Sequence, residues 1–130
     1  EMDQRTAEWL SQGEFDIETA DYMFQGGRYF YAVFMCHMAL EKALKASYCE
    51  KLKDVPPKVH NLLYLIDKAN MNPPEKLGKF LVKLNEANIA TRYPESLENL
   101  MKIYTKPITF EIITNTKEAF QWIRNQLSTS

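Results

Sequence analysis

The sequence has few of the residues from which metal centres, disulfide frameworks and phosphate-binding loops are built. Its 130 residues include only 2 cysteines, 2 histidines and 4 glycines. It contains neither a Cys-x-x-Cys pair nor a His-Glu-x-x-His motif, so a zinc site is not expected. A glycine-rich phosphate loop and a nucleophile elbow are also missing. The sequence alone therefore predicts no metal, no cofactor and no catalytic residue.

Long apolar runs and an excess of one charge sign are absent as well. No stretch approaches the roughly 18 apolar residues of a membrane-spanning helix, and no signal peptide is recognisable. The formal net charge of −1 removes any composition-level argument for avid binding to nucleic acid. Cys36 and Cys49 would lie about 20 Å apart on one helix, too far for a disulfide between them. They are free thiols or intermolecular, and a reducing cytoplasm is the expected location.

A long helix is expected from Arg28 to Lys51, because this segment contains neither glycine nor proline. On a 3.6-residue repeat its main apolar face comprises Tyr29, Ala32, Val33, Cys36, Leu40, Ala43, Leu44 and Ser47. The opposite side is also apolar in the first half of the segment. A helix that is apolar on nearly all sides is usually buried against several neighbours or a partner chain. We therefore expect this helix to be the centre of the fold.

The remaining segments predict further helices and no strand. A first helix should run from about Asp3 to Gln25, where Gly13 costs stability unless a neighbouring helix approaches closely. Helices are also expected over 60–70, from Pro74 to about Asn88, and from Thr109 as N-cap to the end. Between them, Pro94 makes Arg92-Tyr93-Pro94 a fixed corner, with a short helical turn possible over 95–101. The prediction is an all-α, up-and-down bundle of about five helices, forming one domain over 1–130.

Polar side chains at helix flanks and helix ends are the candidates for a binding site. His37, Glu41 and Lys45 are spaced four apart on the central helix and form either a solvated strip or the charged wall of a pocket. Arg92 beside Tyr93 offers a bidentate phosphate donor next to an aromatic ring, although such a corner equally suits a salt bridge. The full set of candidate ligand-binding residues is Asp16, His37, Glu41, Lys45, His60, Arg92 and Tyr93.

Four separated motifs resemble those of the HEPN domain family. The central one is Ala39-Leu-Glu-Lys-Ala-Leu-Lys-Ala46, preceded by the aromatic-rich segment from Gly27 to Phe34. The agreement includes Trp9, Asp16, Ala20 and Asp21 upstream, and His60-Asn-Leu and Arg92-Tyr93-Pro94 downstream. The resemblance covers residues 6–127. It implies a bundle of about five helices, usually a homodimer, that binds a nucleotide or acts beside a minimal nucleotidyltransferase.

Some HEPN members are instead metal-independent ribonuclease toxins of toxin–antitoxin pairs, with an arginine followed after four to six residues by a histidine. This chain departs from that motif, because Leu97, Glu98 and Asn99 stand at the positions that follow Arg92 at this spacing. The expected function is therefore binding, of a nucleotide or of a nucleotidyltransferase protein. RNA cleavage through a non-standard site is the alternative, and a purely structural dimerisation partner is a third possibility.

A homodimer is also expected from the central helix itself. Large apolar side chains lie on sides that its main face does not use: Phe30, Tyr31, Phe34, Met35 and Met38. Leaving them wet would create a patch unusual for a monomer, so they predict an apolar interface of more than about 1,000 Å². Two Arg92-Tyr93 corners would then face one cleft, as the resemblance implies. The alternative is that segment 91–107 folds over these side chains within one chain.

Overall fold

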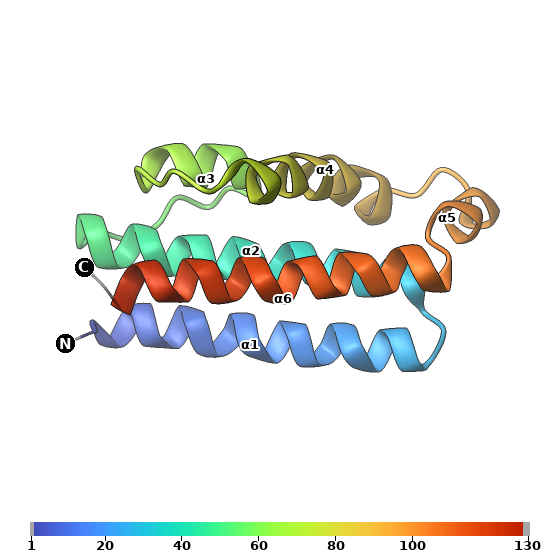
Figure 1. Cartoon of the computed structure of the whole chain (residues 1–130), viewed down its shortest axis with the longest axis horizontal. Helices are drawn as coiled ribbons and strands as arrows, with labels where there is room; N and C mark the ends of the chain where they lie inside the picture. The colour runs from blue at the N-terminus through green and yellow to red at the C-terminus, as the bar shows by residue number, and fades with distance from the viewer. Residues whose placement is uncertain (1, 129–130) are drawn as a thin grey trace.

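The computed structural model describes residues 2–128, with side chains up to Leu127, and within this range it contains helices and no strand. The helices are α1 (Gln4–Gln25), α2 (Tyr29–Leu52), α3 (Leu62–Lys68), α4 (Glu75–Arg92), α5 (Leu97–Ile103) and α6 (Lys106–Ser128). Figure 1 shows α1, α2 and α6 side by side along the long axis. In the same view α3 and α4 lie across one side of this layer, and α5 lies at the end where α4 leads into α6. The predicted all-α fold is confirmed.

Helix α2 is the centre of the bundle, as its apolar pattern predicts. It packs against α1, α3, α4, α5 and α6. Residues such as Ala32, Val33 and Leu40 are completely buried. The buried polar side chains of α2 include His37, Glu41 and Lys45, which form the site described below. No helix within residues 2–128 has the length and hydropathy needed to cross a membrane.

Side-chain capping explains where three of the six helices within residues 2–128 begin. Asp3 accepts a hydrogen bond from the Arg5 N–H at the start of α1, and Ser96 does the same for the Asn99 N–H at the start of α5. Asn61 accepts from two N–H groups and fixes the start of α3. The expectation that Thr109 caps the last helix is wrong, because α6 begins at Lys106 and Thr109 is completely buried within it. Pro107 suits the first turn, since a proline there removes no hydrogen bond.

The turn between α1 and α2 is short and depends on glycine. Gly26 ends α1, and Gly27 has a φ of +75°, a left-handed conformation that glycine adopts without a steric penalty. The chain reverses there and places α1 antiparallel to α2, as the short connection predicts. This pairing brings Trp9 and Asp16 of α1 beside the polar residues of α2.

The aromatic face of α2 that predicts a dimer interface is largely covered within the chain. Phe30 is buried, and Phe34, Met35 and Met38 are half-buried. Only Tyr31 is mainly exposed, at 49%. Two further elements cover this end of α2: α5 lines a cleft with Phe30 and Tyr31, and the side chain of Arg92 lies over Phe34. The expectation of five wet side chains on α2 is therefore wrong, because four of them are buried or half-buried within the chain, with segment 91–107 against Phe30 and Phe34.

Gly13 lies where three helices meet. A Cβ atom at this position would come within 2.6 Å of Phe120 Cε2 on α6 and within 3.1 Å of the Ala39 carbonyl oxygen on α2. The contact with Phe120 is shorter than a Cβ atom tolerates, and the contact with the Ala39 backbone is tight enough that the helix would have to shift slightly. The close helix approach that would explain this glycine is present.

We expect Gly13→Ala to destabilise the protein, although alanine is the better helix former by about 1 kcal/mol. The added methyl group overpacks the α1, α2 and α6 junction, which typically costs about 1–3 kcal/mol. The measurement is urea unfolding, with Ser11→Ala, an exposed position on the same helix, as the control. If Gly13→Ala raised the free energy of unfolding instead, the close approach would be disproved.

Candidate functional site

Glu41 is the centre of a buried polar cluster on α2. Its Oε2 atom accepts a hydrogen bond of 3.0 Å from Lys45 Nζ, one helical turn further on. Its Oε1 atom lies 3.0 Å from His60 Nδ1 and 3.8 Å from His37 Nδ1. Glu41 is 8% exposed and Lys45 is 7% exposed. The stripe is therefore not a solvated strip, and its charges are stabilised by one another because water does not reach them freely.

Lys45 is held by two elements at once. Its Nζ atom, besides contacting Glu41, lies 5.6 Å from the centroid of the Trp9 ring on α1. A cation over an indole face is attracted to the negative quadrupole of the ring. The charge of Lys45 and one of its three N–H donors are thus engaged within the protein. Lys45 supports the position of the Glu41 carboxylate.

His60 is the exposed member of the cluster. It precedes Asn61, the N-cap of α3, so the start of that helix fixes its position. Its side chain is 57% exposed, although Nδ1 contacts the buried Glu41 carboxylate. With a proton on Nδ1, His60 donates to Glu41, and Nε2 is then the nitrogen that accepts a proton or contacts a ligand. A carboxylate that orients an accessible imidazole in this way is a common arrangement for proton transfer.

His37 is the most buried member, with no exposed surface. Neither of its ring nitrogens makes a hydrogen bond of good geometry with the described residues. Burial lowers its pKa to about 4, a shift that the Glu41 carboxylate opposes only in part. Electrostatic interaction with Arg92 and with His60 lowers this pKa further. His37 is therefore neutral at pH 7.

Arg92, the last residue of α4, is stacked on an aromatic ring. Its guanidinium carbon lies 4.9 Å from the centroid of the Phe34 ring on α2. The salt-bridge interpretation of this corner is wrong, since no carboxylate of residues 2–128 lies within ion-pair distance of Arg92. Its Nε atom is buried without a hydrogen-bond partner in the same part of the chain. Arg92 is thus a partly buried cation that the protein itself does not neutralise.

Two of the predicted site residues lie apart from the cluster. Asp16 is buried, and its Oδ2 atom lies 2.8 Å from Lys42 Nζ, so it forms an ion pair between α1 and α2. Tyr93 is 73% exposed and borders a cleft of about 470 Å³ together with Glu86 and Glu95. The structure therefore brings together His37, Glu41, Lys45 and His60, with Arg92 nearby. It leaves Asp16 in a structural role and Tyr93 at the edge.

Sequence reasoning missed three residues that shape the site. Phe34 lies one turn before His37 on α2 and supports the Arg92 guanidinium, a contact between α2 and α4 that depends on tertiary packing. Trp9 is on the expected face of α1, but its contact with Lys45 depends on the packing of two helices. Asn85 on α4 accepts a hydrogen bond of 2.8 Å from the Leu62 N–H and thereby fixes α3 to α4. No local signal in the sequence identifies that bond.

The buried, neutral His37 predicts a specific loss of stability in acid. The unfolded chain takes up a proton on this imidazole below about pH 6.5, whereas the folded chain keeps it neutral down to about pH 4. The contribution of His37 is thus complete above this window and is lost as the pH falls through it. Between pH 7 and pH 5 we expect His37 to cost about 2 kcal/mol of unfolding free energy.

The measurement is urea unfolding at both pH values for the wild type and for His37→Gln. The glutamine variant keeps a polar side chain but cannot titrate, so its stability should depend less on pH by about that amount. An equal pH dependence in the two proteins would show that His37 is not the titrating group.

Comparison with known proteins gives a family and a fold. The model of the HEPN domain family matches residues 6–126. Among solved structures, the protein TT1696 from Thermus thermophilus superposes with a TM-score of 0.80 at 21% identity, covering 95% of this chain and 98% of that one. ST0689, an archaeal HEPN homologue, superposes with a TM-score of 0.76 at 24% identity, covering 96% and 99%. No curated protein matches. Since the family model matches almost the whole length, the chain belongs to the HEPN domain family.

Proposed function

We propose that this protein is a HEPN-type binding module that binds a nucleotide through Arg92 and His60. The observation that carries the proposal is the state of Arg92: its guanidinium is stacked on Phe34 and has no carboxylate partner in the described part of the chain. A partly buried cation without a counter-ion is poorly stabilised by the protein alone. An anionic ligand would supply the missing charge.

The chemistry of Arg92 favours a phosphate group. Stacking on Phe34 fixes the plane of the guanidinium while its edge keeps N–H donors, and this edge matches two phosphate oxygens. His60 and Arg92 both act electrostatically on His37, and we assign both residues to one ligand. Lys45 and Asp16 are already engaged in buried ion pairs and are not part of the proposed contact.

Tyr93 suits the base of the same nucleotide. Its ring is exposed beside a cleft whose rim carries Glu86 and Glu95. An exposed aromatic ring stacks on any base, and such a contact is worth about 1–3 kcal/mol. The two carboxylates repel phosphate and accept hydrogen bonds from amino groups of a base. We therefore place the base over Tyr93 and the phosphate at Arg92.

The same proposal includes a protein partner and a location. The family resemblance supports a minimal nucleotidyltransferase as the partner and a homodimer as the assembly. Cys36 and Cys49 are free and buried, which agrees with the reducing conditions of a cytoplasm. These elements rest on the resemblance and on thiol chemistry, and the nucleotide contact rests on Arg92.

Nucleotide binding is tested by thermal shift and calorimetry with a panel of mono-, di- and triphosphates. At 100 times the dissociation constant, a ligand should stabilise the folded state by about 2.7 kcal/mol. Arg92→Ala should weaken binding at least tenfold, since a hydrogen bond to a charged group is worth about 1.5–3 kcal/mol. Arg28→Ala, which removes an exposed arginine elsewhere, is the matched control. Absence of stabilisation at millimolar nucleotide, or equal binding by Arg92→Ala, would refute the proposal.

A second candidate function, cleavage of RNA as a toxin of a toxin–antitoxin pair, is favoured by the contact between His60 and Glu41. The carboxylate lies 3.0 Å from Nδ1, so it can hold the imidazole in the tautomer whose Nε2 faces outward. Such an imidazole can take the proton of an RNA 2′-hydroxyl while Arg92 binds the adjacent phosphate. His60 would take the role of the family's usual histidine, since residues 97–99 of α5 carry no imidazole.

Incubation of the purified protein with cellular RNA, followed by gel electrophoresis, tests this second candidate. If His60 is the base, cleavage should fall by at least about a hundredfold in His60→Ala. It should fall less in Glu41→Gln, which retains the shape but not the charge. Arg28→Ala should cleave like the wild type. Intact RNA with the wild-type protein, or equal cleavage by His60→Ala, would leave binding as the function.

A further inference from the structure

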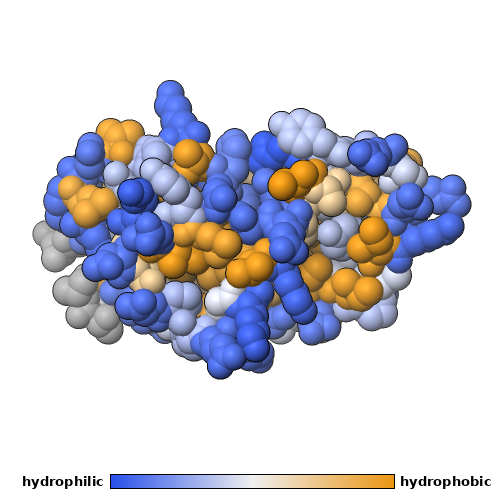
Figure 2. Space-filling model, turned by 90° about the horizontal axis from the view of Figure 1, so that it is seen from above, coloured by the Kyte–Doolittle hydropathy of each residue, from blue (hydrophilic) through white to orange (hydrophobic). Residues whose placement is uncertain are grey.

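An apolar groove runs between α4 and α6, on another face of the molecule from Glu41 and Arg92. It consists of two connected clefts of about 440 and 250 Å³, which share Lys76, Phe80 and Asn115. Its apolar lining includes Leu77, Phe80, Ala87, Ile108, Ile112 and Trp122. In Figure 2 hydrophobic side chains gather in two neighbouring areas along the molecule, with hydrophilic side chains between and around them. Apolar areas of this kind are typical of a surface that another protein covers.

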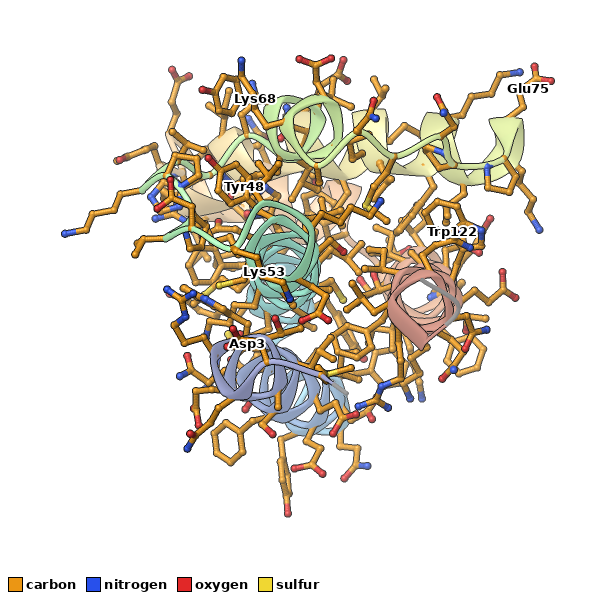
Figure 3. The ribbon with its side chains drawn as sticks, turned by 90° about the vertical axis from the view of Figure 1, so that its left-hand side faces the viewer. Asp3, Tyr48, Lys53, Lys68, Glu75 and Trp122 are labelled. Carbon is orange, nitrogen blue, oxygen red and sulfur yellow. The ribbon has the colours of Figure 1, made fainter. Side chains whose placement is uncertain are left out.

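An aromatic anchor lies at one end of this groove. Figure 3 shows Trp122 pointing from α6 toward the layer of α3 and α4, on the side where α4 begins near Glu75. The Trp122 side chain is half-buried within one chain, and Ile108, further along the groove, is 47% exposed. Tryptophan side chains of this kind often dominate the binding energy of protein interfaces. The groove therefore has an aromatic anchor at one end, of the kind that specific interfaces use.

The two rims of the groove carry opposite charges. Lys76, Lys79 and Lys83 lie on the α4 rim, and Glu111 and Glu118 lie on the α6 rim. Lys79 is paired with Glu75 on its own helix. The other four have no ion-pair partner within residues 2–128. One rim is thus basic and the other is acidic, and apart from Lys79 their charges have no opposite charge within ion-pair distance in the described range.

We propose that this groove binds a second copy of the chain, with the two-fold axis running along the groove. A rotation of 180° about such an axis exchanges the rims and leaves the position of each residue along the groove unchanged. Helix α4 of one copy then lies over α6 of the other, and every basic rim meets an acidic one. The inference rests on the homodimer included in the proposed function, and it identifies the α4–α6 groove as the dimer interface.

The register of the charges supports this axis. Lys83 and Glu111 line one cleft, and Lys76 and Glu118 line the other. After the rotation, Lys83 therefore faces Glu111 of the second copy, and Lys76 faces Glu118 of the second copy. An axis perpendicular to the groove within the interface plane would instead place α4 over α4, with lysines facing lysines. Charge complementarity thus selects one arrangement out of two.

The arrangement has a consequence for the nucleotide site. Because positions along the groove are preserved, the C-terminal ends of both α4 helices lie at the same end of the dimer. Arg92 ends α4, so the two Arg92-Tyr93 corners also lie at that end. The buried apolar surface comes from α4 and α6 and does not require the covered aromatic residues of α2. This interface thus differs from the one that the sequence alone predicts.

Charge reversal tests the proposed interface by sedimentation equilibrium at tens of micromolar protein. The wild type should sediment as a dimer of 15.2 kDa chains. Lys76→Glu/Lys83→Glu and Glu111→Lys/Glu118→Lys should each raise the dimer dissociation constant at least about tenfold, because like charges then face each other. Lys51→Glu/Lys58→Glu, which reverses two exposed lysines outside the groove, should remain a dimer.

The decisive arm is an equimolar mixture of the two groove variants. In the mixed dimer an all-acidic groove meets an all-basic one, so association should return to at least the wild-type level. In a mixture of Glu111→Lys/Glu118→Lys with Lys51→Glu/Lys58→Glu, only the second protein should dimerise, and with itself, because one pair of rims in the mixed dimer is still repulsive. A monomeric wild type, or a groove-variant mixture that stays monomeric, would overturn the proposal.

The result of the dimer test can be distinguished from the result of the nucleotide-binding test. Thermal shifts with nucleotide should persist in Lys76→Glu/Lys83→Glu, because neither lysine is near Arg92 or His60 in the proposed contact. A dimer that fails to form while nucleotide still binds would refute only the groove. Loss of nucleotide binding in Arg92→Ala with an intact dimer would support both proposals.

Discussion

The structure depends on the burial of a charged carboxylate in the central helix. Glu41 lies on a helix that is otherwise enclosed by its neighbours, and a buried carboxylate without partners would be expensive. Its partners come from three parts of the chain: Lys45 from the same helix, His60 from the segment before α3, and Trp9 from α1 through its contact with Lys45. Removing one partner from such a cluster typically costs about 3–5 kcal/mol. The positions of α1, of the 53–61 segment and of α3 are therefore coupled to one side chain.

Arg92 is the contrasting case on the same side of α2. Glu41 is satisfied within the protein, whereas Arg92 is fixed by stacking on Phe34 and lacks an opposite charge in the described range. A residue that is positioned but not neutralised is ready for a ligand, because little ordering remains to be done when the ligand arrives. This difference separates the structural residues of the cluster from those proposed to bind. The Asp16–Lys42 ion pair belongs with the structural residues, because its two opposite charges meet within the protein.

Much of the fold can be predicted from the sequence because it follows from local patterns. The 3.6-residue apolar period identifies α1, α2, α4 and α6, and Gly13 marks the close approach of helices. Helix α4 continues past its expected end at about Asn88 as far as Arg92, and Pro94 follows two residues later. The start of α6 is harder to predict, since Thr109 is a plausible cap but Pro107 already fits a first helical turn. Local chemistry offers two starts, and packing decides between them.

The site can be predicted only in part, because burial depends on contacts between distant segments. The spacing of His37, Glu41 and Lys45 indicates a common flank, but the sequence does not tell whether α3 and its preceding loop cover that flank. The aromatic face of α2 suggests a partner chain, whereas most of that face is buried or half-buried within one chain. Similarly, the groove between α4 and α6 depends on how the two helices pack, and that packing has no signature in the residues of either helix.

Arg92 is proposed to bind the phosphate of a nucleotide, and the chemical shift of its Nε–H group measures this contact directly. Nuclear magnetic resonance of arginine side chains labelled with ¹⁵N, with the Arg92 signal assigned through Arg92→Lys, follows that group during a titration. The account predicts that the Arg92 Nε–H signal shifts saturably with a nucleotide, less with inorganic phosphate, and not with the corresponding nucleoside. An Arg92 signal that stays unchanged while nucleotide binds, or an equal shift with the nucleoside, would contradict it.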